Sequence, residues 1–535
     1  MLRSGRSQPS SQTRTGVDAI IVGSGINSLV CAALLARAGR RVRVLEREAV
    51  LGGCIRTDEL TLPGFRHDTL STAHPLFLVG PAYETLGPAL HAAGLAYCNT
   101  DSPTAVLTPD GRHLVLRTSR QRNMAAFGAD GAALDAALAD VARRTPLLFA
   151  LLGGELWRWP AARTLAGYAW RDGAHDLAGF VGEALQPARA WLEQAFLSDL
   201  ARALLAPWVL HCGLGPDAPL SALMARVVAA TLETVGMPLV AGGNANTVRA
   251  FEAVVRAAGG DVVTGADVDK VLVKGGRAVG VRLADGCEQR CGDVICNVTP
   301  TQLYGRLLDA QHVPPDVAAQ ARAWRYGKGN MQIHLALCEA PAWPTRDLDR
   351  VAYLHLTAGP DAVSRAVNEC ERGLLPAEPT ICVAQPTALD PSRAPAGHHI
   401  LWIQLPECPR KPVGDAGGRI DVDPRLGWTP ALREAYADRA IDSIARHVPN
   451  LRRAMLARAV LSPADLQRLN INLVGGDPYG GDCALDQSLL WRPLRATRNH
   501  ATPIAHLWHI GASTHPGPGL GGGSGFHVAQ ALGAA

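Results

Sequence analysis

The sequence predicts an α/β fold in which a Rossmann-type nucleotide-binding domain is joined to a second, helix-rich α+β domain. Three observations predict it: a strand–glycine turn–helix–strand unit near the N-terminus, a long helical middle region, and a glycine-rich segment near the C-terminus. The chain has 535 residues, which is too many for one compact core, since a domain usually holds about 150 residues. We therefore expect a discontinuous nucleotide-binding domain that the second domain interrupts.

The composition excludes several functional classes. Hydrophobic residues make up 47% and charged residues 19% of the chain, which is typical of a globular protein and not of a disordered one. The formal net charge of +4 is too small to indicate a nucleic-acid partner. The 12 cysteines include no CxxC pair, which disfavours a zinc site and a redox-active dithiol. We predict no metal site.

The N-terminal segment and the hydropathy pattern bear on location. Residues 1–16 are rich in Arg and Ser and have no apolar centre, so we expect a disordered, solvated tail and not a secretory signal. No run of 18 or more apolar residues occurs, so no membrane-spanning helix is predicted. We expect a cytoplasmic protein. Peripheral membrane contact through long amphipathic helices stays open beside the packing of those helices on the nucleotide-binding domain.

The first folded segment has the pattern of a β-α-β unit. Residues 17–22 are a short apolar run that suits a buried parallel strand. Residues 26–38 suit a helix closed by Gly39, and residues 41–46 form a second strand. A span of about 30 residues is typical of half a dinucleotide-binding domain.

The turn inside this unit has the features of a pyrophosphate-binding loop. Gly23 permits the tight turn, and Gly25 lacks a Cβ, so a phosphate can approach the helix N-terminus. Ser28 stands at the third small position, which serves helix packing and is usually glycine. Glu46 ends the second strand at the spacing, about 20 residues, of a carboxylate that binds ribose hydroxyls. The pattern predicts a dinucleotide-type cofactor.

Downstream of this unit the pattern changes twice. Ala- and Leu-rich helical patterning dominates from about residue 80 to residue 235. A strand-rich block follows, in which Gly275 and Gly276 provide a hairpin turn. Because no second glycine fingerprint follows another strand, we expect no bound nicotinamide cofactor. The strands predicted in the block are residues 261–264, 270–273, 278–283 and 293–296.

Further motifs near both ends of the chain carry a family resemblance. Residues 51–57 (LGGCIRT) are similar to the GGxxxT continuation of FAD-binding amine oxidases, and residues 63–68 (PGFRHD) to a PGFxxD element. Residues 472–493 resemble a GGDxxGG…Q…RP stretch, and residues 510–525 a C-terminal flavin-binding signature. Over about half of its length, the chain resembles the phytoene-desaturase-like FAD-dependent oxidoreductases, which include carotenoid desaturases, carotenoid isomerases and retinol saturases.

The resemblance implies an amine-oxidase/phytoene-desaturase-like architecture with FAD as the cofactor. The FAD-binding domain would comprise residues 17–80, 236–300 and 495–535, and the substrate domain residues 81–235 and 301–494. The C-terminal glycines permit backbone conformations in which N–H groups face a flat ligand. The residues expected to bind FAD are Gly23, Gly25, Ile26, Asn27, Ser28, Glu46, Arg47, Gly52, Gly53, Arg56, Thr57, Val268, Gly511, Ala512, Gly521, Gly522 and Gly523.

The predicted activity is dehydrogenation or desaturation, in which an apolar or polycyclic metabolite gives a hydride to the flavin. A flavin accepts a hydride with little help once the geometry is set, so a base is needed only for the accompanying proton. Lys328, which begins a strand-like run, Tyr479 and His67 are the candidates, each weighed against a structural role. His515 is expected to shape the flavin loop. Oxygen, a quinone or a soluble carrier would reoxidise the flavin.

Three other activities stay open on the same scaffold. A redox-neutral isomerase would use reduced FAD without net hydrogen transfer. An amine oxidase would need a pair of aromatic side chains around the amine, which the sequence does not locate. A non-catalytic lipid escort, like the Rab GDP-dissociation inhibitors, is disfavoured by the intact Gly25, Glu46 and C-terminal glycines. The sequence leaves the substrate, the electron acceptor and the choice between monomer and homodimer undetermined.

Overall fold

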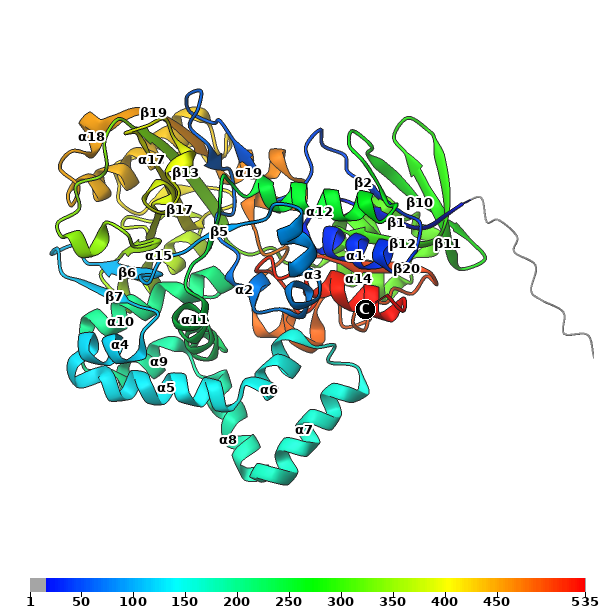
Figure 1. Ribbon diagram of the computed structural model, residues 1–535, viewed down its shortest axis with the longest axis horizontal. Helices are drawn as coiled ribbons and strands as arrows, with labels where there is room; N and C mark the ends of the chain where they lie inside the picture. The colour runs from blue at the N-terminus through cyan, green and yellow to red at the C-terminus, as the bar shows by residue number, and fades with distance from the viewer. Residues whose placement is uncertain (1–15, 535) are drawn as a thin grey trace, which may run out of the picture.

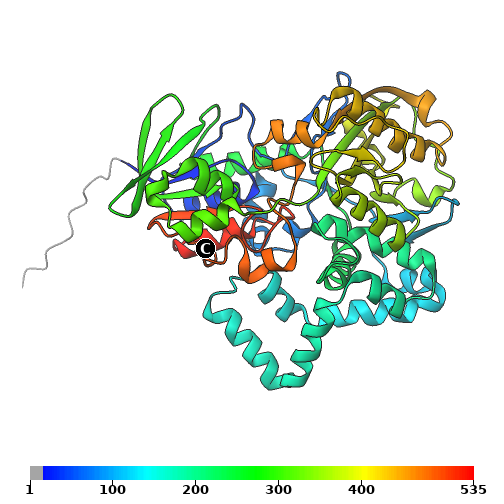
Figure 2. The same ribbon diagram turned by 180° about the vertical axis from the view of Figure 1, so that it is seen from behind.

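Two seven-stranded sheets organise the protein, as a computed structural model that describes residues 16–534 shows (Figure 1; seen from behind in Figure 2). Residues 1–15 of the predicted tail lie outside the described residues. The first sheet and its helices form one lobe, and the second sheet with most of the remaining helices forms the other.

The first sheet combines segments from the start, middle and end of the chain. β1 pairs in parallel with β2 and with β12, β2 with β9, and β12 with β20, whereas β10, β11 and the start of β12 run antiparallel. This parallel order is that of a doubly wound nucleotide-binding sheet, and ligands bind such sheets at the carboxyl ends of the strands. The strands are β1 (Val17–Val22), β2 (Val42–Leu45), β9 (Asp261–Val263), β10 (Val268–Lys274), β11 (Arg277–Leu283), β12 (Glu288–Asn297) and β20 (Leu507–Ile510).

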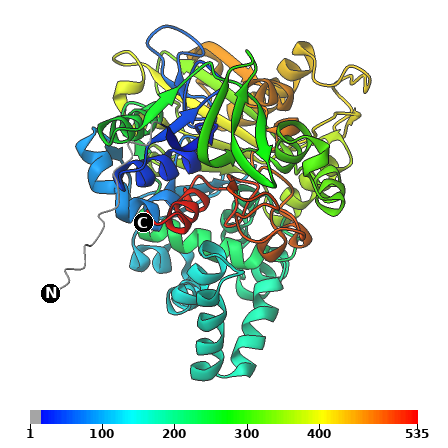
Figure 3. The ribbon, with the colours of Figure 1, turned by 90° about the vertical axis from the view of Figure 1, so that its right-hand side faces the viewer.

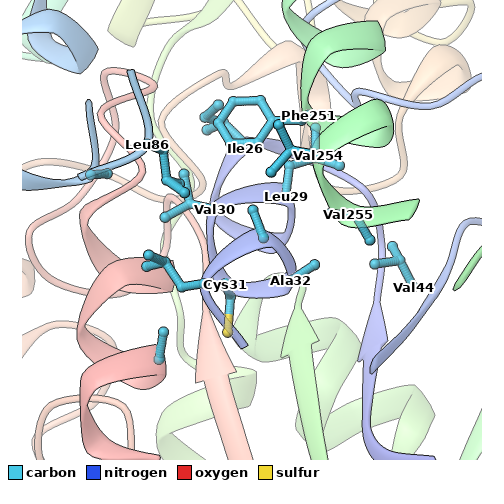
Figure 4. Packing of buried hydrophobic residues seen from close by; sticks show 14 of the residues in the cluster. Ile26, Leu29, Val30, Cys31, Ala32, Val44, Leu86, Phe251, Val254 and Val255 are labelled. Atoms are coloured by element: carbon cyan, nitrogen blue, oxygen red, sulfur yellow. The ribbon is translucent and has the colours of Figure 1, made fainter. Parts of the chain in front are cut away.

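The helix after β1, α1 (Ile26–Arg37), is buried on all sides. All its residues except Arg37 are buried, because α12 (Ala245–Ala257) and α20 (Gly523–Ala531) pack against it on top of the sheet. Figure 4 shows its apolar side chains between those of α12, β2 and α3 (Pro81–Ala92). A helix that is apolar all round is stable only when it is covered in this way. The covering fixes the start of α1 at the edge of the sheet.

The second sheet is mainly antiparallel and has the order β19-β13-β17-β16-β14-β6-β7, with β14 and β6 parallel. Side chains alternate between its two faces. One face packs on α17 (Pro430–Ala445), and the other, here called the inner face, packs on the helical region. The strands are β6 (Thr104–Leu107), β7 (His113–Leu116), β13 (Gly329–Leu337), β14 (Tyr353–Leu356), β16 (Ile381–Ala384), β17 (His399–Cys408) and β19 (Met455–Leu461).

The helical region between residues 120 and 235 covers the inner face. Its longest helix, α11 (Ser221–Val235), lies closest to the cavity described below, whereas α7 (Trp159–Asp172) and α8 (Ala174–Leu185) project away from both lobes (Figure 3). No helix within residues 16–534 is long and apolar enough to cross a membrane. The other helices of the region are α4 (Arg120–Phe127), α5 (Gly131–Arg143), α6 (Thr145–Leu148), α9 (Ala188–Ala195) and α10 (Asp199–Leu205).

Shorter elements connect the two lobes and complete the chain. The remaining strands are β3 (Thr57–Asp58), β4 (His67–Asp68), β5 (Tyr97–Cys98), β8 (Leu239–Val240), β15 (Leu374–Leu375) and β18 (Gly414–Asp415). The remaining α-helices are α2 (Pro75–Leu78), α13 (Pro300–Gln302), α14 (Pro315–Arg322), α15 (Pro360–Glu371), α16 (Pro386–Leu389), α18 (Leu451–Ala454) and α19 (Pro463–Leu469).

Candidate active site

A cavity of about 390 Å³ extends from the carboxyl ends of the first sheet to the inner face of the second. One half is lined by the turns that follow β1, β2, β12 and β20. The other half is lined by α11, by the segment around Trp208, and by residues of β13, β14 and β17. The cavity thus joins the place where a doubly wound sheet binds nucleotides to a space lined by α11 and the second sheet.

The turn after β1 leaves room for an anion at the start of α1. Gly23 has φ +86°, and a Cβ on Gly25 would lie 3.0 Å from Asn297 Nδ2. No side chain caps α1, and no acidic residue stands in its first turn, so its N–H groups suit a phosphate. Ile26 and Asn27 line the cavity, whereas Ser28 is buried behind it and accepts a hydrogen bond from Asn297 Nδ2 at 2.9 Å.

Glu46 lines the same half and is held by hydrogen bonds. The backbone N–H and the hydroxyl of Ser24 donate to its Oε2 at 2.9 and 2.6 Å. The Glu48 N–H donates to Oε1 at 3.0 Å. Ser24 Oγ also accepts from the Gly52 N–H at 2.9 Å. The sequence predicted the carboxylate but missed Ser24, which connects the turn after β1, the end of β2 and the next glycine loop.

The second glycine loop packs closely on the first. A Cβ on Gly53 would lie 3.4 Å from Gly25 Cα, and both Gly52 and Gly53 have positive φ. Both line the cavity together with Arg47 and Arg56, and Arg56 donates to Asp58 at 2.7 Å. The loop therefore closes the cofactor half of the cavity around Gly25.

Of two further residues predicted to bind FAD, Val268 and Thr57, only one lines the cavity. Val268 lines the cavity. Thr57 instead donates to Asp68 Oδ1 at 2.7 Å and accepts from the Ala245 N–H at 3.0 Å, and it is not among the cavity-lining residues. Thr57 therefore supports the loop from outside the cavity.

The C-terminal glycines divide between the cavity and helix packing. Ala512 and the segment Gly517–Leu520 line the cavity, whereas Gly511 and residues 521–523 do not. A Cβ on Gly522 would lie 2.7 Å from Val30 Cγ2, so this glycine lets α20 approach α1. The segment just before residues 521–523 thus reaches the cavity, and contact of residues 521–523 with the cofactor stays a prediction.

The structure separates the candidate bases. Tyr479 lines the cavity, and its hydroxyl donates to the Leu210 carbonyl oxygen, while burial holds its pKa well above the usual range. Lys328 precedes β13 and is not among the lining residues. Its Nζ donates to the Gly213 carbonyl oxygen at 3.2 Å and lies 4.0 Å from Glu371 Oε1. The structure therefore places Lys328 outside the cavity lining, and its role as a base stays a prediction.

The predicted histidines also lie outside the cavity lining. The ring of His67 packs on His334 with 5.2 Å between the centroids and hydrogen-bonds to Thr61 at 2.8 Å. Burial, then the neighbouring His334 and Arg393, lower the pKa of His67 to about 2. Burial lowers the pKa of His515 to about 4. Both imidazoles are therefore neutral parts of the packed interior at physiological pH.

The inner face of the second sheet contributes residues that the sequence did not single out. Gln332, Gln404, Cys382 and His355 stand opposite one another in register across β13, β17, β16 and β14. Both glutamines line the cavity, and with the Asn330 amide oriented to accept, Gln404 Nε2 donates to it at 2.6 Å. A signal was available in the sequence, because Asn330 and Gln332 alternate with apolar residues in the run that forms β13.

Aromatic side chains from three separate segments border this half. We call Trp208, Tyr353 and Trp402 the aromatic wall. The Tyr353 and Trp402 rings are 5.6 Å apart at 54°, and those of Trp208 and Tyr353 are 6.3 Å apart. The apolar residues of α11 that line the same half are Met224, Val227, Val228 and Leu232. This half of the cavity is suited to an apolar molecule.

Two histidines adjoin the aromatic wall. His211 lines the cavity, and its Nε2 is 2.9 Å from Nε2 of the fully buried His355. Burial lowers the pKa of His211 to about 4, and burial followed by the neighbouring His211 lowers that of His355 well below its usual value. Within residues 16–534, these two and Cys382 have ligating atoms within 4.8 Å of one another, a grouping that the cysteine spacing did not predict.

Comparisons with known proteins agree with this geometry. The family model described as flavin containing amine oxidoreductase matches residues 29–409. The chain is 28% identical over 553 residues to "Pyridine nucleotide-disulfide oxidoreductase domain-containing protein 2" of Mus musculus, covering 96% of this chain and 93% of that protein. It is 23% identical over 532 residues to the phytoene desaturase (neurosporene-forming) of Cereibacter sphaeroides, covering 94% and 92%.

A solved structure confirms the architecture. Cyclohexylamine oxidase from Brevibacterium oxydans superposes with a TM-score of 0.56 over 97% of this chain and 100% of its own, at 15% identity. At that identity the likeness shows the fold alone, and it confirms the predicted amine-oxidase-like architecture. Since the family model spans more than half of the chain, we conclude that the chain belongs to the flavin containing amine oxidoreductase family and is an FAD-dependent oxidoreductase of the phytoene-desaturase-like group.

Proposed function

We propose that the enzyme dehydrogenates an apolar small molecule bound between the aromatic wall and α11. The observation that carries the proposal is the distribution of charge in the cavity. The charged lining residues are Glu46, Arg47, Glu48, Arg56, Asp267 and Arg306, all from the cofactor side. Among the described residues that line the other half, none is an acid, a lysine or an arginine. An ionised substrate would be desolvated there without a partner, which is costly.

We assign FAD to the cofactor half of the cavity. The uncapped start of α1 would bind the pyrophosphate, and Glu46 would bind the ribose hydroxyls. The segment from Ala512 to Leu520 would border the flavin ring. The narrow space beside Gly25, which a Cβ would fill, fits this assignment. Bound there, FAD supplies the acceptor for a hydride from carbon.

The residues around the substrate would act by orientation and exclusion of water. The aromatic wall and the aliphatic side chains of α11 offer an apolar surface that would hold the reacting carbon in place. The Tyr479 hydroxyl already donates to Leu210 and keeps a raised pKa, so it is a poor proton acceptor. The proton that accompanies the hydride would therefore leave without a strongly basic side chain.

The proposal is tested by flavin bleaching. Purified protein should be yellow. Neutral hydrocarbons, terpenoids and polycyclic compounds are then added one at a time without oxygen, and we expect at least one of them to reduce the flavin. Primary and secondary amines of similar size should not reduce it. Bleaching by amines alone would reassign the enzyme to amine oxidation, with Tyr353 and Trp402 as the aromatic pair.

A matched variant checks where FAD binds. Gly25→Val places a branched side chain against Asn297 and in the path of the pyrophosphate, so the variant should fold but purify without flavin. Gly179→Ala changes a glycine of α8 that has an ordinary helical backbone and no heavy atom near its added Cβ, and it should keep full occupancy. A fully yellow Gly25→Val protein would contradict the assignment.

Isomerisation is the second candidate, because the same cavity and reduced FAD would serve it. The two reactions differ in net hydrogen transfer. For dehydrogenation, each product molecule should be two hydrogens lighter than its substrate, and one equivalent of oxidant should be consumed. A product of unchanged mass, formed only after the flavin has been reduced, would identify an isomerase.

We also propose a cytoplasmic protein, monomeric or homodimeric, that can contact a membrane peripherally. The support for such contact is the exposure of Trp159 and Trp170, 78% and 92%, on the projecting helix α7. Tryptophans favour the water–lipid boundary. Co-sedimentation with neutral phospholipid vesicles should fall when both are changed to Ser. Equal sedimentation of the two proteins would remove the membrane from the proposal.

A further inference from the structure

The His211–His355 pair occupies an unusual place, because it is a polar group at the apolar end of the cavity. His211 follows the segment around Trp208, and His355 lies on β14, so the fold joins residues 144 positions apart. The rings meet edge to face, with 5.1 Å between their centroids. The Trp208 ring packs on both, at 4.8 and 4.9 Å. Packing and the mutual hydrogen bond thus fix the orientation of His211.

This orientation leaves one nitrogen for a ligand. His211 Nε2 is engaged by His355, and Nδ1 of His211 has no partner within residues 16–534. Because His211 lines the cavity, Nδ1 is the atom that it can offer there. When His355 Nε2 donates to His211 Nε2, His211 carries its proton on Nδ1 and is a donor; in the reverse tautomer, Nδ1 is an acceptor. The pair therefore matches a neutral group that accepts or donates one hydrogen bond.

The surroundings restrict the charge of that group. No carboxylate, lysine or arginine of the described chain lines the cavity beside the aromatic wall. The nearby polar side chains, Gln332 and Gln404, are uncharged, and Oε1 of Gln332 is buried without a partner. An ionised end would meet only dipoles, whereas a hydroxyl or carbonyl would be satisfied by one hydrogen bond.

We propose that His211, oriented by His355, binds a hydroxyl or carbonyl oxygen at one end of an otherwise apolar substrate. The proposal rests on the function proposed above and goes beyond it, since it divides neutral substrates into those that carry an oxygen and pure hydrocarbons. His355 is a positioning residue that acts through His211. The oxygen anchors one end of the molecule, and the aromatic wall holds its body.

The test compares three ligands with similar p-menthane ring skeletons: limonene, a hydrocarbon, carvone, the ketone, and carveol, the alcohol. Their dissociation constants are measured by calorimetry on the FAD-loaded wild type and on His211→Phe. The ratio of the limonene constant to each oxygenated ligand's constant should fall roughly 3- to 10-fold in His211→Phe, the value of one neutral hydrogen bond. His175→Phe, which makes the same substitution at an exposed histidine of the projecting helix α8, should leave both ratios within about twofold.

The outcomes separate this proposal from the broader one. FAD content, read from the absorption spectrum, should be equal in all three proteins, and binding ratios do not depend on flavin bleaching. If apolar ligands bleach the flavin but the ratios are the same in wild type and His211→Phe, the oxygen subsite is overturned and the proposed function stands. His355→Leu should reduce the ratios partially, since His211 loses its orientation. One tightly held zinc ion per wild-type chain, lost in His355→Leu, would assign the pair and Cys382 to a metal and also overturn the proposal.

Discussion

Ser24 links three segments that line the cofactor half of the cavity. Its hydroxyl donates to Glu46 and accepts from the Gly52 N–H, so one oxygen atom connects the first glycine loop, the end of β2 and the second glycine loop. A hydrogen bond to a carboxylate is stronger than one between neutral groups. The carboxylate is thereby fixed before a ribose arrives, which lowers the entropic cost of binding.

We predict that Ser24→Ala weakens FAD binding about 10-fold, because the bond from hydroxyl to carboxylate contributes on the order of 1.5 kcal/mol. The measurement is the titration of FAD into flavin-free protein, followed by quenching of FAD fluorescence. Ser443→Ala, which removes a half-buried hydroxyl bond to the Arg439 carbonyl oxygen within α17, is the control and should leave the affinity unchanged. An affinity that is equal in Ser24→Ala and wild type would remove Ser24 from the cofactor site.

Glu407 on β17 makes stability depend on pH. It is fully buried, and burial raises its pKa to about 7 even though it accepts a hydrogen bond from the Thr380 N–H at 2.8 Å. An acid with a raised pKa binds its proton more tightly in the folded state than in the unfolded state. The free energy of unfolding therefore falls as pH rises from about 4.5 to 7, and stays low above that.

We predict that Glu407→Gln raises the midpoint of thermal unfolding at pH 8, by an amount that corresponds to on the order of 1–3 kcal/mol. The gain should shrink as pH is lowered and should be small near pH 4.5, where the wild-type carboxyl is protonated in the folded state and about half protonated in the unfolded state. Thermal unfolding of both proteins between pH 4.5 and 8 checks this. A difference between them that does not vary with pH would show that Glu407 does not titrate in this range.

At the scale of elements, α20 packs closely on α1 because glycines stand where the two helices meet. A Cβ on Gly525 would lie 1.9 Å from the Asn27 carbonyl oxygen, so alanine there forces the two helices apart. Asn27 lines the cavity. Separation of the helices therefore disturbs the cofactor site as well as the packing.

We predict that Gly525→Ala destabilises the protein by about 1–3 kcal/mol, the usual cost of overpacking, and lowers FAD occupancy. Gly167→Ala is the matched control, because Gly167 also lies in a helix but has no heavy atom near its added Cβ. That change should leave stability equal or raise it by up to about 1 kcal/mol. Calorimetric unfolding together with flavin content compares the two variants, and equal behaviour would contradict the close seating of α20.

Elements with a strong local pattern were predictable, and side-chain placement was not. The apolar runs at 17–22 and 293–296 and the Gly275–Gly276 turn were found because strand and turn signals are local. In the sequence, Lys328 is a candidate base because it begins a strand-like run. Its orientation depends on contacts with Gly213, 115 residues away. In a strand, a shift of one residue moves a side chain to the opposite face of the sheet. The sequence pattern alone does not determine which face a residue beside a strand will occupy.

The substrate half was the least predictable part of the molecule. His211 and His355 meet through the packing of a helical segment on a sheet, and no local spacing signals the pair. The aromatic wall combines Trp208, Tyr353 and Trp402 from three separate segments. In a loop that binds a cofactor, the glycines and the acidic residue keep a fixed spacing, because the cofactor is the same molecule in every such protein. A substrate pocket follows the shape of its own ligand and has no such spacing.

At the scale of the whole molecule, the five parallel neighbours of the first sheet form one nucleotide-binding unit. One glycine fingerprint opens it, and its cavity leads to the aromatic wall. The second sheet is mainly antiparallel, and within the described residues no GxG turn joins one of its strands to a following helix. We therefore expect the electron acceptor that restores the flavin to be something other than a tightly bound nicotinamide.

We predict that NADH or NADPH, mixed anaerobically with the flavin-loaded protein, leaves the flavin oxidised for at least several seconds. Stopped-flow absorbance at the flavin maximum measures this, with dithionite as the positive control for reduction. Bleaching by either nucleotide within a second would show a productive nicotinamide site and would contradict the expectation.

The strand order of the first sheet also determines when this sheet can finish folding during synthesis of the chain. β12 needs β20 as a neighbour, and α1, made among the first forty residues, needs α20 as its cover. Neither partner exists until the ribosome has translated past residue 505. The early segments must therefore wait, with apolar surface exposed, while about 450 residues are added, which takes tens of seconds at ordinary rates of translation. A stop codon that removes only the final 30 residues would leave the first sheet and α1 without these partners, so late truncations should be as damaging to this lobe as early ones.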